Sequence, residues 1–272
     1  MREHIAFIGG GNMAGAMISG LQAQGFPVDQ IDVVEPFAEA QARLQSAFGI
    51  SAHPLAGEFL NRATLIVWAV KPQSFKEAAL QSRAWTNKAL HVSVAAGIPS
   101  DSIAQWLGNE RIIRTMPNTP ALIGKGMTAL FARAAVTATD REHGERVVSG
   151  MGQFLWLQDE GLLDAVTAIS GSGPAYMFYF MEAMISAGAE MGLPPEQAHH
   201  LAVATFIGAG ELARASHEPP EILRQRVTSK GGTTHAAIES MDASHMKALF
   251  AQALHAAYQR AREMGVEFGS SV

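Results

Sequence analysis

Three consecutive glycines near the start of the chain constrain its fold more than any other feature. They follow a short apolar run at 5–8 and precede a segment at 12–24 with helical periodicity. The loop reads Gly9, Gly10, Gly11, Asn12, Met13 and Ala14, a G-x-G-x-x-A pattern. Its glycines permit a tight turn and close approach of a pyrophosphate, and the N–H groups of the following helix attract phosphate. We therefore expect residues Gly9 to Met13 to bind a dinucleotide.

Short apolar runs and helical segments alternate through the first 160 residues. Strands are expected at 5–8, 31–35, 64–70, 90–94, 111–115 and 127–131. Such alternation implies right-handed βαβ units and a mostly parallel sheet, covered on both faces. From residue 161 the chain is rich in Ala, Met, Glu and His. Helices are expected there at 161–169, 174–191, 195–216, 219–227, 233–241 and 243–265. We therefore expect an α/β domain over 1–160 and an all-α domain over 161–272.

Composition excludes several classes of function. The 272 residues are 48% hydrophobic and carry a net charge of −5, which argues against a nucleic-acid binder. There is no cysteine, so disulfides, thiolate metal sites and a cysteine nucleophile are excluded. The N-terminal apolar run is too short for a signal peptide, and no apolar stretch is long enough to span a membrane. We expect a cytoplasmic protein without a membrane partner.

The segment 174–191 is apolar around most of its circumference. A helix of this kind must be buried on all sides. A domain of about 110 residues rarely buries one helix so completely, so we expect an interface with a second subunit. The alternative is an ordinary central core helix.

An acidic residue ends the second predicted strand. Glu35 in that position would hydrogen-bond a ribose 2′-hydroxyl and repel a 2′-phosphate, which favours NADH over NADPH. Arg43 on the following helix can offset this effect. The alternative for Glu35 is a solvated charge at a strand end.

Two further strand ends contribute to the expected cofactor site. Ala69, Val70, Lys71 and Pro72 end the strand at 64–70. Ligands bind at the carboxyl edge of such sheets, where Lys71 can face a phosphate or a ribose, or simply solvent. Ala95 and Ala96 follow the strand at 90–94, and we assign them to the same site.

Five motifs in this chain resemble those of the pyrroline-5-carboxylate reductases. They are Ile8-Gly-Gly-Gly-Asn-Met-Ala14, Ala69-Val-Lys-Pro-Gln73, Arg114-Thr-Met-Pro-Asn-Thr-Pro120, Ser170-Gly-Ser-Gly-Pro-Ala-Tyr176 and Val227-Thr-Ser-Lys-Gly-Gly-Thr-Thr234. The resemblance implies reduction of L-1-pyrroline-5-carboxylate to L-proline with NADPH or NADH, the last step of proline synthesis. It also implies an N-terminal Rossmann-type domain, a C-terminal all-α dimerisation domain, and homodimers that often assemble further into decamers.

The last of these motifs suits a substrate that carries a carboxylate and a ring nitrogen. Gly231 and Gly232 let the backbone approach closely, and Thr233 and Thr234 begin a helix whose N–H groups attract an anion. A threonine hydroxyl there can cap its own helix or donate to a ring nitrogen. The resemblance implies that Gly231, Gly232 and Thr233 bind the carboxylate and that Thr234 contacts the nitrogen as the catalytic residue.

Three other polar residues are candidates for the site. Asn118 is held between prolines at a strand end, either close to the nicotinamide or in a plain turn. The resemblance places an acidic residue near position 160 at the substrate site, which makes Glu160 a candidate. His235 adjoins the threonines and is a candidate proton relay. The spacing of the ten histidines does not indicate a metal site.

The chain departs from the resemblance at two places, and two other functions compete with it. Lys230 stands where the family usually has proline, and Leu55-Ala56-Gly57 replaces a frequent asparagine. A β-hydroxyacid dehydrogenase has the same domain order, but it requires a lysine in the helix at 174–191, where this chain has none. A nicotinamide-nucleotide sensor would bind the cofactor without turnover, and would leave the Gly-Gly-Thr-Thr loop without a role.

Overall fold

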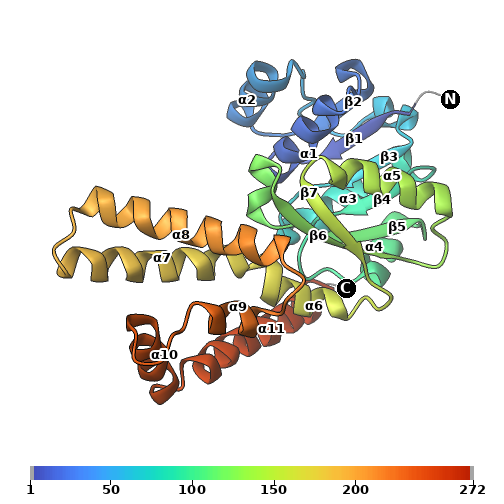
Figure 1. Ribbon diagram of the computed structural model, residues 1–272. Helices are drawn as coiled ribbons and strands as arrows, with labels where there is room; N and C mark the ends of the chain where they lie inside the picture. The colour runs from blue at the N-terminus through green and yellow to red at the C-terminus, as the bar shows by residue number, and fades with distance from the viewer. Residues whose placement is uncertain (1–2, 270–272) are drawn as a thin grey trace. The chain divides into compact units, whose positions relative to one another are not determined.

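A computed structural model describes residues 3–269, which divide into two units (Figure 1). The sheet unit comprises residues 3–172 and 257–269, and the helical unit comprises Gly173–Ala256. This boundary lies later than the expected one at 160/161, because helix α6 (Leu162–Val166) packs on strands of the sheet unit. The chain also returns to the sheet unit at Ala257, within helix α11 (Met246–Gly269).

The sheet has seven strands in the order β2-β1-β3-β4-β5-β6-β7. The strands are β1 (Ile5–Ile8), β2 (Ile31–Val34), β3 (Leu65–Trp68), β4 (Leu90–Ser93), β5 (Ile112–Met116), β6 (Gly126–Ala132) and β7 (Gly152–Trp156). All neighbouring pairs are parallel except β5 and β6, which are antiparallel. The mostly parallel α/β class is therefore confirmed, whereas β7 is not among the predicted strands.

Helices cover both faces of this sheet, as Figure 1 shows. They are α1 (Asn12–Ala23), α2 (Ala38–Phe48), α3 (Pro72–Thr86), α4 (Ser100–Leu107) and α5 (Ala138–Ser149). Successive side chains of a strand point to opposite faces, so Phe7 joins one apolar cluster and Ile8 the other. Strands β1 to β4 are buried along their whole length, which explains why they read as continuous apolar runs.

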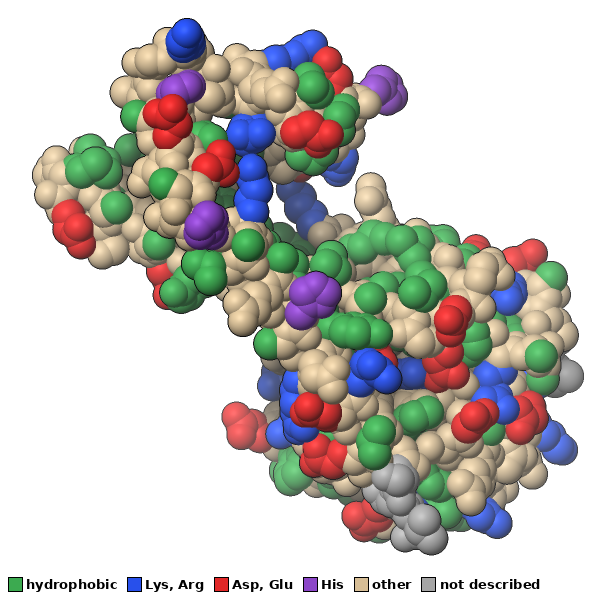
Figure 2. Space-filling model, turned by 90° about the horizontal axis from the view of Figure 1, so that it is seen from below, with side chains coloured by type: hydrophobic (Ala, Val, Ile, Leu, Met, Phe, Trp, Pro, Cys, Tyr) green, Lys and Arg blue, Asp and Glu red, His purple; other side chains and the backbone are tan. Residues whose placement is uncertain are grey.

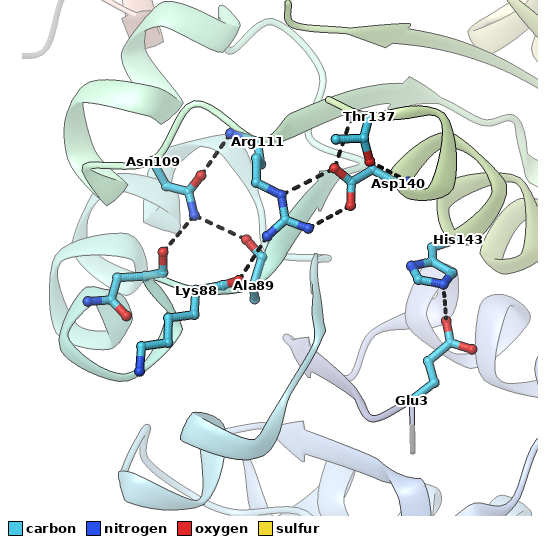
Figure 3. A network of polar contacts seen from close by, with 9 residues as sticks. Glu3, Lys88, Ala89, Asn109, Arg111, Thr137, Asp140 and His143 are labelled. Carbon is cyan, nitrogen blue, oxygen red and sulfur yellow. Dashed lines mark hydrogen bonds and ion pairs between the residues drawn. The ribbon is translucent and has the colours of Figure 1, made fainter. Parts of the chain in front are cut away.

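A polar network fastens α5 to the beginning of β5 (Figure 3). Thr137 and Asp140 form a capping box at the N-terminus of α5. The Asp140 carboxylate also accepts hydrogen bonds from Arg111 Nε at 3.2 Å and Nη2 at 2.6 Å. Burial by itself would raise the pKa of Asp140, but the hydrogen bonds from Arg111 and Thr137 outweigh it and lower the pKa. The ion pair thus holds α5 to the sheet at an end remote from the glycine turn.

The helical unit contains α7 (Gly173–Glu190), α8 (Pro195–Ala215), α9 (Pro220–Arg226), α10 (Thr233–Ala243) and the first half of α11. Helices α7 and α8 pack against each other as a long hairpin (Figure 1). The side chains of Phe178 and Tyr179 on α7 are nevertheless 57% and 70% exposed. Figure 2 shows hydrophobic side chains at the surface of both units. Apolar surface on this scale is typical of an interface with another chain.

None of the helices in residues 3–269 combines the length and the apolar character needed to cross a membrane.

Candidate active site

The glycine turn between β1 and α1 has the geometry of a phosphate cradle. Gly9 has a φ of +97°, and a Cβ atom there would lie 2.5 Å from the Ala69 carbonyl oxygen. A Cβ atom on Gly10 would lie 2.6 Å from Leu44 Cδ1. A Cβ atom on Gly11 would meet no atom within 4 Å, and Gly11 is the N-cap residue of α1, which has no side-chain cap. Open space in front of an uncapped helix N-terminus fits a bound pyrophosphate.

The carboxyl ends of β1 to β4 meet at one edge of the sheet. Ile8, the last residue of β1, lies between Val34 of β2 and Trp68 of β3. This arrangement brings together the expected cofactor residues at 9–13, Glu35, 69–72 and 95–96. Strand β3 ends at Trp68, earlier than expected, so Ala69 and Val70 belong to the loop. Lys71 is exposed and Pro72 opens α3.

The Glu35 side chain is folded against the glycine turn and is 6% exposed. Its Oε2 atom accepts a hydrogen bond from the Gly10 N–H at 2.8 Å, and Oε1 accepts one from the Phe37 N–H at 3.0 Å. The Arg43 guanidinium lies nearby, with Nη2 3.4 Å from the Gly10 carbonyl oxygen. Glu35 is therefore not a freely solvated charge at a strand end.

Asn118 links two segments of the sheet unit through its side-chain amide. Its Oδ1 accepts a hydrogen bond from the Met127 N–H at 2.9 Å. Its Nδ2 donates to the Ser170 carbonyl and hydroxyl oxygens, each at 3.2 Å. Ser170 lies in η4 (Thr167–Gly171), a single turn of π-helix. These contacts fix the Asn118 side chain between β6 and η4.

Glu160 lies at the centre of a network that the sequence did not reveal. Its Oε1 accepts hydrogen bonds from Arg114 Nη1 and from the Ser100 N–H, both at 2.6 Å. Its Oε2 accepts one from the Ser100 hydroxyl at 2.5 Å. Ser100 begins α4, so the carboxylate satisfies a free N–H group at that helix N-terminus. The signal that could have pointed to Arg114 is a charged residue inside a strand whose first four residues are all buried.

The loop before α10 belongs to the helical unit. Gly231 has a φ of +74°, in the left-handed region that favours glycine. Helix α10 begins at Thr233, and its N-cap residue is Gly232, which supplies no side-chain cap. The alternative in which a threonine caps this helix is therefore wrong, because both threonines lie inside its first turn. An uncapped N-terminus after two glycines suits a carboxylate ligand.

His235, beside Thr234, pairs with a carboxylate of its own helix. His235 Nδ1 lies 3.3 Å from Oε2 of Glu239, one helical turn later. Within residues 3–269, no three His, Cys, Asp or Glu side chains are grouped so that they could hold a metal ion.

Two family models match the chain in the two regions just described. The model for pyrroline-5-carboxylate reductase dimerisation matches residues 160–264. The model for NADP oxidoreductase, coenzyme F420-dependent, matches residues 4–97, which include the glycine turn.

Several characterised proteins resemble the chain over its whole length. The pyrroline-5-carboxylate reductase of Pseudomonas aeruginosa is 47% identical, over 97% of this chain and 98% of that protein. The enzyme of the same name from Haemophilus influenzae is 38% identical, over 97% and 98%.

Solved structures agree with these sequence comparisons. The structure of a pyrroline-5-carboxylate reductase from Coxiella burnetii has a TM-score of 0.89 and 35% identity, over 96% of this chain and 98% of that one. The Plasmodium falciparum pyrroline carboxylate reductase with NADP bound has a TM-score of 0.87 and 26% identity, over 97% and 98%. Full-length identity at this level, with the expected glycine turn and helical region in place, shows that the chain belongs to the pyrroline-5-carboxylate reductase family.

Proposed function

We propose that this chain reduces L-1-pyrroline-5-carboxylate to L-proline with NADPH or NADH, the last step of proline synthesis. The observation that carries the proposal is the 47% identity to a pyrroline-5-carboxylate reductase over 97% of the chain. The similarity therefore includes both the glycine turn of the sheet unit and the loop before α10 in the helical unit.

The cofactor site consists of residues at the carboxyl edge of the sheet. The backbone of the turn from Gly9 to Met13 holds the pyrophosphate, and Glu35 lies at the adenosine ribose. The loops at 69–72 and 95–96 line the rest of the cofactor site, and Asn118 lies at its nicotinamide end. When bound, the reduced nicotinamide supplies the hydride that reduces the C=N carbon.

The substrate site is formed by the loop before α10. Gly231, Gly232 and Thr233 offer backbone N–H groups to the substrate carboxylate at the helix N-terminus. The Thr234 hydroxyl donates a hydrogen bond to the ring nitrogen. Hydride addition to the neighbouring carbon breaks the C=N double bond and moves its electron pair to this nitrogen, which takes up a proton from solvent to become the amine. The hydrogen bond from Thr234 offsets the negative charge that develops there, so it strengthens in the transition state.

Glu160 supports the site indirectly. Its carboxylate holds Ser100, and thereby the end of the loop that carries Ala95 and Ala96. We assign Glu160 to the substrate region as a positioning residue.

The functional assembly is a homodimer or a multiple of it, such as a decamer. Support comes from the exposed apolar side chains of α7 and from the match to the family's dimerisation model. Tyr179→Glu should convert the assembly to monomers in sedimentation experiments. Leu80→Glu, at an exposed position of α3, is the matched control and should leave the assembly intact. A wild-type monomer at micromolar concentration would contradict the proposal.

The need for a reduced nicotinamide cofactor also supports the cytoplasmic location expected from the sequence.

A turnover assay separates the proposed activity from the two competing ones. We expect oxidation of NADPH or NADH that depends on added pyrroline-5-carboxylate. Cofactor binding without turnover would favour a nucleotide sensor instead. Turnover only with β-hydroxy acids and oxidised cofactor would favour a hydroxyacid dehydrogenase.

A further inference from the structure

We propose that Glu35 makes the cofactor site select NADH over NADPH. The proposal rests on the proposed function and its cofactor site. It goes further by assigning the choice between the two cofactors to the part of the site that binds the adenosine ribose.

The Glu35 carboxylate is held in one place. Each of its oxygens accepts a backbone N–H bond, from Gly10 at 2.8 Å and from Phe37 at 3.0 Å. The side chain is almost completely buried, so it cannot swing into solvent to make room for a second anion. A carboxylate oxygen can accept more than one hydrogen bond, so each oxygen can still accept one from a ribose hydroxyl.

The Glu35 carboxylate lies beside the glycine turn, where the ribose next to a bound pyrophosphate would be. Glu35 directly follows β2, and its Gly10 contact lies beside Gly11, where the cradle is open. The Gly9 N–H in turn donates to the Val34 carbonyl oxygen at 2.8 Å, which fixes the end of β2 against the turn. A pyrophosphate in the cradle therefore places the adjoining ribose against Glu35. A 2′-phosphate on that ribose would bring two anions together, whereas a 2′-hydroxyl would donate a hydrogen bond.

Arg43 is the cation that could reverse this preference. Its guanidinium contacts the Gly10 carbonyl oxygen at 3.4 Å, and its side chain is otherwise exposed. Water and salt screen the charge of an exposed guanidinium, while the buried carboxylate is screened much less. The fixed carboxylate of Glu35 therefore sets the preference for NADH over NADPH, and Arg43 only reduces the size of this preference.

Binding measurements test the selection independently of turnover. We would titrate the full-length protein with adenosine 5′-monophosphate and with adenosine 2′,5′-bisphosphate, which differ only by the 2′-phosphate. The wild type should bind the monophosphate at least tenfold more tightly. NADH and NADPH should show the same order when their binding is followed by nicotinamide fluorescence.

Variants of Glu35 separate charge repulsion from support of the turn. Glu35→Gln keeps the shape, removes the charge and retains one of the two oxygens that accept backbone N–H groups, and Glu35→Ser also opens space. Both should lower the preference for the monophosphate at least tenfold. Glu39→Ser removes an exposed carboxylate from the first turn of α2 and is the matched control, which should keep the wild-type ratio. Thermal unfolding identifies any variant that fails to fold.

The outcomes distinguish three cases. The proposal is supported if the Glu35 variants lower the ratio of the two affinities, for the monophosphate and the bisphosphate, while Glu39→Ser leaves this ratio unchanged. Equal weakening of both ligands in Glu35→Gln would overturn it, because Glu35 would then only support the glycine turn. If the wild type binds neither the fragments nor the whole cofactors, the cofactor site itself is wrong and the proposed function fails with it.

Discussion

Arg114 Nη1 lies 2.6 Å from Glu160 Oε1, and this ion pair joins the middle of the sheet to the chain segment that leaves it. The Arg114 side chain is 9% exposed and that of Glu160 is 25% exposed. Because Glu160 also binds both the N–H and the hydroxyl group of Ser100, one carboxylate connects β5 to the N-terminus of α4.

Glu160→Ala should destabilise the protein by about 2 kcal/mol, because it leaves the buried Arg114 guanidinium without its partner. The partial exposure of Glu160 keeps this value below that of a fully buried pair. Glu110→Ala is the matched control, since it removes a carboxylate that is 63% exposed and paired with Arg133. The control substitution should lower the free energy of unfolding by less than about 1 kcal/mol. Urea unfolding measures both changes, and equal losses would contradict the special role of Glu160.

Thr234→Ala and Thr234→Val should lower kcat by roughly tenfold to a hundredfold, which corresponds to about 1–3 kcal/mol of a lost hydrogen bond. Thr234→Ser keeps the donor and should be mild. The loss should appear in kcat because the hydrogen bond from Thr234 to the ring nitrogen strengthens as hydride reaches the neighbouring carbon.

A matched control for Thr234 is Thr233→Ala, in the same helical turn. It removes a hydroxyl but keeps the backbone N–H that we assign to the carboxylate, so kcat should change little. Thermal unfolding of all four variants corrects for losses of folded enzyme. Normal turnover by folded Thr234→Ala would remove Thr234 from the catalytic site.

His91 should make stability depend on pH. Burial, with a smaller contribution from the Arg111 charge, lowers the pKa of His91 to about 3 from an ordinary value of 6.5. Between these two values the unfolded chain binds a proton that the folded protein does not, so stability is complete above pH 6.5 and falls with decreasing pH. The contribution of one such group is about 1.4 kcal/mol per pH unit in this window.

His91→Asn tests this dependence. It keeps an acceptor for the Trp68 indole N–H, which donates to His91 Nδ1 at 3.0 Å, but it has no ionisable group. Urea unfolding between pH 6 and pH 4.5 should show a shallower decline for this variant than for the wild type. If the free energy of unfolding falls with pH equally in the variant and the wild type, His91 is not a buried neutral imidazole.

The elements that could be predicted from sequence are those with a local cause. Strand β1 and the turn at Gly9 follow from a buried apolar run and from positions that exclude a side chain. The parallel strands β1 to β4 were visible because both of their faces are buried. The start of α10 at Thr233 follows from the two glycines before it.

The parts that could not be predicted depend on contacts between distant residues. Strand β7 alternates between half-buried and exposed residues at the sheet edge, so it has no continuous apolar run. The antiparallel pairing of β5 with β6 is a property of the sheet and not of either strand. The pair of Arg114 and Glu160 joins residues 46 positions apart, and neither sequence neighbourhood signals it.

Isotope transfer tests the central claim most directly, because it follows the hydride from cofactor to substrate. The enzyme would be supplied with L-1-pyrroline-5-carboxylate and with NADH that carries deuterium at the transferable C4 position. We predict L-proline with deuterium on C5, the ring carbon beside nitrogen that was part of the C=N bond. Formation of proline without deuterium, or oxidation of NADH without formation of proline, would contradict the account.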